Sequence, residues 1–184
     1  SDKTYDGNDV ATLNTGAVLY SGLINGDTLT GTYSGVFDNA NVGTGKTVTI
    51  TSSYGGTDAN NYTITDQAST TGNIAAKSLT ATASASNKVY DATNSATTTL
   101  TLTGLIGTET LTTSNTSTFN NKNVGTGKTV TVNSITLTDG TGLATNYSIS
   151  PGQTTTANIT AKALTAIASA TNKVYDSTTL ANTT

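Results

Sequence analysis

Several residue types that proteins use for covalent or acid–base chemistry are missing or scarce in this sequence. Cysteine, histidine, methionine and tryptophan do not occur among the 184 residues, all eight basic residues are lysine, and proline occurs once. Without cysteine the chain has no disulfide framework and no thiolate nucleophile. Without histidine, and with a single glutamate, a general acid and base are hard to assemble. We therefore predict no enzymatic activity, no catalytic or metal-ligating residue and no cofactor.

Charge of either sign is also scarce. Charged residues make up 10% of the chain, and the net charge is −3. With no arginine to bind phosphate groups, nucleic acid is not an expected partner. No apolar run reaches the length of about 18 residues that spans a bilayer, so we expect no membrane-spanning segment. The low charge also argues against disorder, because disordered chains usually combine low hydrophobicity with high net charge.

What the sequence does contain is threonine, 46 residues of it, and threonine favours strands because its branched side chain is stiff. Apolar and polar residues alternate in short stretches, which is typical of half-buried strands. In residues 130–137 the phase of this alternation shifts across Asn133 and Ser134, which indicates a bulge or a tight turn. The stretches expected as strands contain Leu79 to Ala85, Leu164 to Ala170, Leu100 with Leu102, Val48 with Ile50, Val130 with Val132, Tyr62 with Ile64, and Tyr147 with Ile149.

Internal repeats give the domain organisation. Residues 73–92 align without a gap with residues 158–177, and 15 of the 20 positions are identical. Residues 41–49 (NVGTGKTVT) recur unchanged as residues 123–131. The offset between equivalent positions is 85 residues at the ends of the repeat and 82 in its middle, so length changes are expected in two loops. We expect an all-β fold of tandem, antiparallel, Ig-like sandwiches, with a β-grasp-like sheet as the alternative.

The predicted boundaries are 1–78 for repeat 1, 79–163 for repeat 2, and 164–184 for the opening segment of a third repeat. Repeat 1 lacks the Leu-Thr-Ala strand that precedes the Tyr-Asp pair in repeat 2. A single strand with a turn cannot bury its own apolar face. If residues 164–184 are ordered, they must dock on repeat 2 or on another chain.

The Gly-Thr-Gly-Lys-Thr stretch resembles part of a phosphate-binding loop. That loop needs a further glycine upstream, where this chain has Ala40 and Lys122, and a helix afterwards, where a strand is expected. We therefore interpret the stretch as a glycine-rich turn that starts a strand. Its residues in the two copies are Gly43, Gly45 and Lys46, and Gly125, Gly127 and Lys128.

The recurring Tyr-Asp pairs could contribute to a sugar or calcium site, since aspartate is a hard oxygen ligand and tyrosine stacks on sugar rings. The structural interpretation is that tyrosine fills the edge of the core while aspartate closes a turn on backbone N–H groups. We favour the structural interpretation. The pairs are Tyr5 with Asp6, Tyr90 with Asp91, and Tyr175 with Asp176.

An isopeptide crosslink is a further hypothesis for a chain without cysteine. Lys88 with Asn146 or Asn158 would form it, and Asp91 is the recurring acid that could assist. A lysine near a strand end more often protects a sheet edge, and we favour that interpretation.

The ordered set of motifs, Lys-Val-Tyr-Asp, Asn-Val-Gly-Thr-Gly-Lys-Thr-Val, Asn-Tyr-x-Ile (with Tyr62 and Tyr147) and Ile-x-Ala-Lys-x-Leu-Thr, resembles the YDG and related "mostly beta, glycine-rich" repeats. Such repeats occur in large bacterial adhesins of the filamentous-haemagglutinin type. The glycine of the YDG motif is present only at Gly7 and is replaced by Ala92 and Ser177 in the later copies.

The resemblance implies export to the bacterial cell surface or extracellular matrix, with the repeats acting as a stalk, spacer or fibre, and no particular ligand. The expected partners are neighbouring repeats of the same chain. Two other functions stay open: a self-assembling fibre subunit that uses residues 164–184 for strand addition, and a module that binds surface glycans or calcium.

Overall fold

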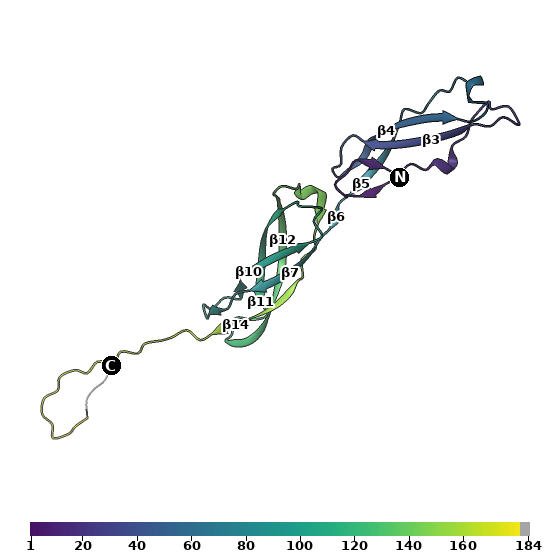
Figure 1. The fold of residues 1–184 in the computed structure, drawn as a ribbon. Helices are drawn as coiled ribbons and strands as arrows, with labels where there is room; N and C mark the ends of the chain where they lie inside the picture. Colours follow the sequence, from purple (N-terminus) through teal and green to yellow (C-terminus); the bar gives the residue numbers. More distant parts are fainter. Residues whose placement is uncertain (181–184) are drawn as a thin grey trace.

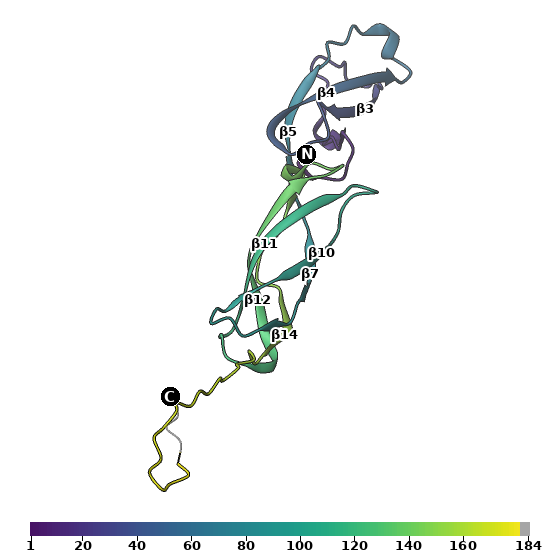
Figure 2. The same ribbon diagram turned by 90° about the vertical axis from the view of Figure 1, so that its left-hand side faces the viewer.

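Two all-β units lie end to end in the computed structural model, which describes residues 1–180 (Figure 1). An extended C-terminal segment continues from the second unit, at the end far from repeat 1 (Figure 2). The last four positions of the predicted opening segment, 181–184, lie outside the described residues. The prediction of an all-β fold is confirmed.

Repeat 1 is built on one five-stranded sheet with the order β1-β5-β4-β3-β2. The long ladders, β3 with β4 and β4 with β5, are antiparallel, and the short edge strand β1 pairs parallel with β5. The elements of this unit are β1 (Lys3–Thr4), β2 (Val10–Ala11), β3 (Thr30–Phe37), β4 (Gly43–Gly55) and β5 (Ser69–Ala75), with the 3-10 helices η1 (Thr15–Ala17) and η2 (Ala59–Asn61).

Repeat 2 repeats this sheet as β8-β14-β12-β11-β9 and adds two small sheets, β10-β7 and β13-β6. Strand β6 belongs to this unit by its pairing, although it precedes the predicted boundary at Leu79. The elements are β6 (Lys77–Ser78), β7 (Thr80–Ala85), β8 (Lys88–Val89), β9 (Ser95–Ala96), β10 (Thr98–Thr103), β11 (Leu111–Phe119), β12 (Gly125–Asp139), η3 (Ala144–Asn146), β13 (Tyr147–Ser148) and β14 (Thr154–Thr160).

The bulge predicted from the phase shift is present in β12. Val132 pairs with Ser117 and Ser134 pairs with Thr116, so Asn133 has no counterpart on β11. The extra residue turns Ile135 and Leu137 toward the same face of the sheet as Val132. The equivalent ladder of β4 with β3 has no such bulge. Asn133 is therefore one of the extra residues of repeat 2 that return the offset between the repeats from 82 to 85.

The core of repeat 2 lies between its five-stranded sheet and the β10-β7 pair. Phe119, Val130 and Ile159 are buried on the large sheet, and Ala85 at the end of β7 packs against them. At the other end of β7, Leu79 is only 4% exposed. The small sheet thus closes repeat 2 as the second layer of a sandwich. Residues 1–180 contain no α-helix of the kind that packs across a β-grasp sheet.

Two predicted strands are wrong in part. Residues 62–64 form no strand, whereas their equivalents in repeat 2 begin β13, because β13 pairs with β6 and no described strand lies beside Tyr62. Residues 164–169 are likewise assigned to no strand, and Leu164 is 91% exposed. The pairing partner decides the first case, since a strand needs a neighbour to satisfy its backbone groups.

Candidate functional site

The most elaborate side-chain arrangement in the structure is the joint between the two repeats. The hydroxyl of Tyr5, from repeat 1, donates a hydrogen bond to Oε1 of Glu109 in repeat 2 at 2.6 Å. The hydroxyl of Tyr147 donates to Oε2 of the same carboxylate, also at 2.6 Å. The two tyrosine rings meet edge to face, with centroids 5.3 Å apart. One carboxylate therefore accepts from both repeats, and bonds of this charge-assisted type are stronger than neutral ones.

Asn146 forms the second half of this joint. Its Oδ1 accepts a hydrogen bond from the backbone N–H of Val42 at 2.9 Å, and its Nδ2 donates to Oδ1 of Asn41 at 3.0 Å. Asn146 is only 1% exposed and therefore cannot bind water, so these two hydrogen bonds satisfy its buried amide group. The joint, defined as Tyr5, Asn41 and Val42 on one side and Ile106, Glu109, Asn146 and Tyr147 on the other, fixes the orientation of both repeats.

Burial and the neighbouring carboxylate make the joint depend on protonation. Burial first, and then the hydrogen bond and negative charge of Glu109, raise the pKa of Tyr5 to about 12. Burial and Glu109 likewise raise the pKa of Tyr147 above its ordinary value. Both phenols are thus neutral donors across the physiological range, which is the state that the Glu109 carboxylate requires.

The residues that form the joint have equivalents at the outer ends of the two repeats. In repeat 1 the hydroxyl of Tyr62 donates to Asp27 at 2.5 Å and accepts from the N–H of Ile24 at 3.1 Å. These bonds match those of Tyr147 with Glu109 and with the N–H of Ile106. At the far end of repeat 2, Tyr90 N–H donates to Thr160 at 2.8 Å, as Tyr5 N–H does to Ala75. We call Asp27 and Tyr62, which correspond to Glu109 and Tyr147, the socket, and we call Tyr90, which corresponds to Tyr5, the plug. The two repeats thus have a socket at one end and a plug at the other.

The predicted Tyr-Asp residues form turns at the ends of the repeats. In each copy a lysine three residues earlier pairs with the aspartate, with Nζ–Oδ1 distances of 2.7, 2.8 and 2.6 Å for Asp6, Asp91 and Asp176. The same aspartate oxygen accepts a backbone N–H two residues later. The Lys88 ion pair and the bonds from Thr93 lower the pKa of Asp91 to about 2. Tyr5 is buried, Tyr90 is half-buried and Tyr175 is 88% exposed.

The residue after each Tyr-Asp pair has a left-handed backbone conformation. Its φ is +81° at Gly7, 65° at Ala92 and 60° at Ser177. The turn therefore keeps its shape when glycine is lost, at a conformational cost for the larger residues. At Gly7 there is a second reason for glycine, because an added Cβ would lie 2.8 Å from Cγ2 of Ile106 across the joint.

The predicted glycine-lysine residues form bulged turns at the start of β4 and β12. Gly45 has φ +61° and donates its N–H to Asn73 at 2.8 Å, and Gly127 does the same to Asn158. Lys46 pairs with Asp38 at 2.7 Å, while Lys128 donates to Asn121. A strand follows each turn, and the lysines have protein partners. The geometry is that of a structural turn and differs from a phosphate-binding loop, which leads into a helix.

The proposed isopeptide partners have separate contacts. Lys88 Nζ binds Asp91, Thr93 and the carbonyl of Ser95, and it lies 5.7 Å from the ring centroid of Phe119. Asn146 is engaged in the joint, and Asn158 accepts from Gly127. Within residues 1–180 no cluster of three or more acidic side chains is placed to hold a metal ion. The same residues include no helix long and apolar enough to cross a membrane.

Sequence reasoning missed Glu109, and it placed Asn146 in the recurring Asn-Tyr-x-Ile motif and in a possible crosslink but not in a contact between repeats. A signal for both was present in the repeats. The Gly-Leu-Ile blocks align Ile24 with Ile106, and the same offset places Asp27 opposite Glu109. A carboxylate recurring in an otherwise weakly charged chain, together with the recurring Asn-Tyr pair, marks the positions that build the joint.

These features define a class, a tandem all-β repeat protein whose two described units pack end to end through a joint of hydrogen-bonded side chains. The chain belongs to the YDG domain family, whose profile matches residues 1–71 and 75–157. Comparison with curated proteins and comparison with solved structures each give no match.

Proposed function

We propose that this chain is a structural stalk or spacer segment of a large bacterial adhesin at the cell surface or in the extracellular matrix, and that it performs no catalysis. The observation that supports the proposal best is the joint, because its parts recur at both ends of the described repeats. A unit with a plug at one end and a matching socket at the other extends an array in one direction.

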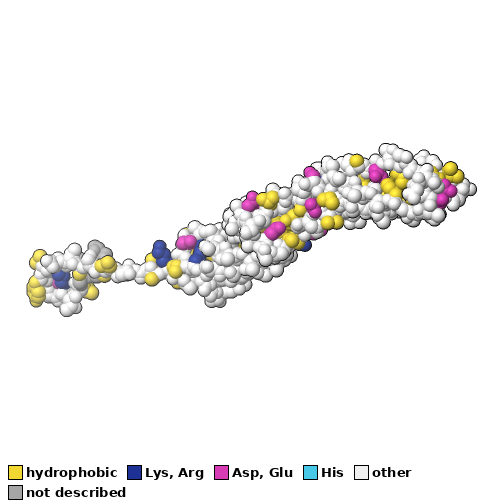
Figure 3. Space-filling model, turned by 45° about the horizontal axis from the view of Figure 1, so that its top comes forward, with side chains coloured by type: hydrophobic (Ala, Val, Ile, Leu, Met, Phe, Trp, Pro, Cys, Tyr) yellow, Lys and Arg dark blue, Asp and Glu magenta, His cyan; other side chains and the backbone are white. Residues whose placement is uncertain are grey.

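Stiffness is the mechanical property that a stalk needs, and the joint supplies it. Tyr5 and Val42 of repeat 1 are tied to Glu109 and Asn146 of repeat 2, at two separate points of the interface. Two separated anchor points resist both bending and rotation about the array axis. Figure 3 shows acidic side chains scattered singly along the face of the two units that it presents, and the net charge of the chain is only −3, so charge repulsion is a small contributor to extension.

The test is to vary copy number. Chains in which residues 79–163 are present once, twice and three times would be measured for length by electron microscopy and small-angle scattering. We expect each added copy to lengthen the particle by the same increment, because every joint has the same geometry. Compaction of the longer chains, or increments that differ from copy to copy, would contradict the proposal.

A further inference from the structure

The first and last segments of repeat 2 run side by side along the unit. We call residues 77–90 the entry segment, because they connect to repeat 1, and residues 147–160 the exit segment, because they lead out at the opposite end (Figure 1). Both segments run away from the joint, since β6 pairs parallel with β13 and β8 pairs parallel with β14. The chain therefore enters and leaves repeat 2 at opposite ends, through two parallel neighbours.

Backbone pairing joins the two segments next to the joint. There β6 pairs with β13, and the N–H of Leu79 donates a hydrogen bond to the carbonyl of Ser148 at 2.8 Å. We call these contacts the joint-end clamp. Beyond them, residues 78–81 and 150–153 border the same cavity of about 400 Å³, and β7 lies beside β14. The segments thus stay adjacent between their two ends.

A second set of hydrogen bonds joins the segments at the other end of repeat 2. There β8 pairs with β14, and the N–H of Tyr90 donates to the carbonyl of Thr160 at 2.8 Å. Asn87 adds a side-chain contact, because its Oδ1 accepts from the N–H of Asn158 at 2.7 Å. We call these contacts the far-end clamp. The entry segment is therefore tied to the exit segment at both of its ends.

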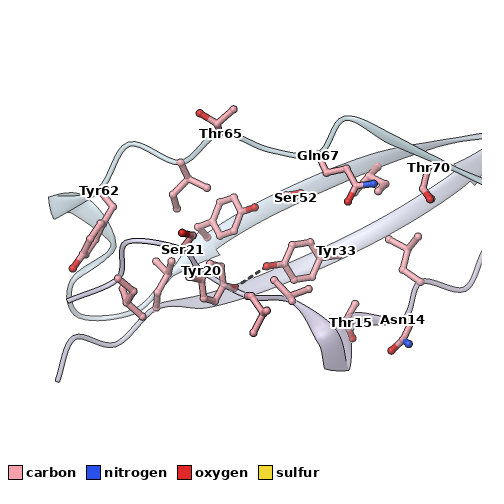
Figure 4. A pocket seen from close by; sticks show the side chains of 18 of the residues that line it. Asn14, Thr15, Tyr20, Ser21, Tyr33, Ser52, Tyr62, Thr65, Gln67 and Thr70 are labelled. Carbon is pink, nitrogen blue, oxygen red and sulfur yellow. Dashed lines mark hydrogen bonds between the residues drawn. The ribbon is translucent and has the colours of Figure 1, made fainter. Parts of the chain in front are cut away.

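The far-end clamp also occurs in repeat 1. Strand β1 pairs parallel with β5, and the N–H of Tyr5 donates to the carbonyl of Ala75 at 2.8 Å. An aspartate, Asp2, takes the place of the asparagine, and its Oδ1 accepts from the N–H of Asn73 at 2.8 Å. Residues 62–63, the equivalents of β13, form no strand and border the pocket drawn in Figure 4. Both repeats thus share the far-end clamp, built with different side chains.

Tension along a stalk would pull the two segments of repeat 2 in opposite directions. The entry segment would be drawn toward repeat 1 and the exit segment toward the far end, each along its own length. Because the hydrogen bonds of a sheet run across the strands, those of each ladder would be loaded together in shear. The antiparallel ladders resist the same movement, since β7 pairs with β10 along its whole length and β14 pairs with β12.

We propose that repeat 2 is a tension-bearing module, in which the joint-end and far-end clamps carry load between its first and last segments. This inference rests on the proposed stalk function and adds resistance to force to it. Load reaches the clamps without a slack linker, because only Ala76 separates β5 of repeat 1 from β6 of repeat 2. The response of such a module to force depends on its unfolding rate and not on its equilibrium stability.

The experiment is single-molecule force spectroscopy of the full chain, pulled in two directions. Because the chain has no cysteine, pairs of introduced cysteines define the points of attachment. The pair Ala75→Cys and Ala163→Cys, at exposed positions on either side of repeat 2, loads both clamps along the strands. The pair Thr112→Cys and Thr138→Cys, which lie opposite each other on β11 and β12, peels that ladder open one pair at a time. We expect a severalfold higher rupture force in the first direction, and an equal or lower force would overturn the proposal.

Two matched substitutions, made with the handles at positions 75 and 163, test the far-end clamp itself. Asn87 and Asn121 are both exposed, and the Oδ1 of each accepts a backbone N–H, from Asn158 at 2.7 Å and from Asn123 at 3.0 Å. Only the first bond joins the entry segment to the exit segment. We expect Asn87→Ala to lower the rupture force and Asn121→Ala to leave it unchanged. A force that is unaffected by Asn87→Ala, or lowered equally by both substitutions, would overturn the role of the far-end clamp.

Failure of this proposal and failure of the stalk function give different results. The copy-number test measures length without applied force, so the strength of the clamps does not enter it. Equal length increments together with a rupture force that does not depend on direction would overturn the tension-bearing proposal alone. Unequal increments would overturn the stalk function.

Discussion

Tyr5 and Glu109, 104 positions apart in the sequence, share a hydrogen bond of 2.6 Å that crosses from one repeat to the next. The same carboxylate accepts from Tyr147, so a single acidic side chain holds one phenol from each repeat. Because this group links side chains of both repeats, it contributes to their relative orientation as well as to stability. The joint therefore depends on the negative charge of Glu109 and on the protonation of both tyrosines, and each dependence can be tested.

Replacing Glu109 with glutamine should weaken the joint. The amide keeps the shape of the side chain but removes the charge that both hydroxyls bind, and hydrogen bonds to charged groups contribute about 1.5–3 kcal/mol. We expect the free energy of unfolding, measured with denaturant, to fall by about that amount. The control is Asp27→Asn, which alters the equivalent carboxylate at the open end. It should leave the relative orientation of the repeats intact, as residual dipolar couplings would show.

High pH should loosen the joint through the tyrosines. The pKa of Tyr5 is raised from 10.0 to about 12, so the folded state binds the phenolic proton more tightly than the unfolded chain. The stabilisation is complete below pH 10 and is lost as the pH rises toward about 12. Ultraviolet titration of tyrosinate, followed together with the melting temperature, tests this. Tyr5→Phe should lack the late titration step, and an unchanged curve in that variant would assign the step elsewhere.

The residue after Tyr-Asp offers a matched pair of opposite substitutions. Ala92→Gly relieves a left-handed alanine, worth about 1–2 kcal/mol, against a glycine entropy cost of about 0.5–1 kcal/mol. Repeat 2 should therefore gain roughly 0.5–1 kcal/mol in calorimetric unfolding. Gly7→Ala should lose about 2 kcal/mol or more, because strain adds to the contact with Ile106. Equal and opposite effects would show that the joint contact is unimportant.

Calcium should leave the melting temperature unchanged. The aspartate of the Tyr-Asp pair recurs in all three copies, and its carboxylate already binds a lysine and a backbone N–H. Asp91, for example, binds Lys88 and the N–H of Thr93. A ligand present at 100 times its dissociation constant would stabilise the fold by about 2.7 kcal/mol, which is easily detected. A rise in melting temperature on adding calcium, or specific binding on a glycan array, would favour the adhesion-module alternative.

Much of the fold could be predicted from the sequence, because period-two alternation and repeat alignment are local signals. The bulge at Asn133 and the all-β class are examples. The failures concern partners. Residues 62–64 have a strand pattern but form no strand, because no described strand lies beside Tyr62, and a pattern does not reveal whether such a neighbour exists. The joint was missed for a related reason, since Glu109 acts only through contacts with another repeat.

The central claim is that the two repeats form one stiff, extended unit. Small-angle scattering of the chain at low protein concentration measures this on single chains. The account predicts a distance distribution that matches two repeats fixed end to end as in Figure 1, and a broader one once Glu109→Gln is added. A distribution typical of two units on a free hinge, unaffected by the Glu109 substitution, would contradict it.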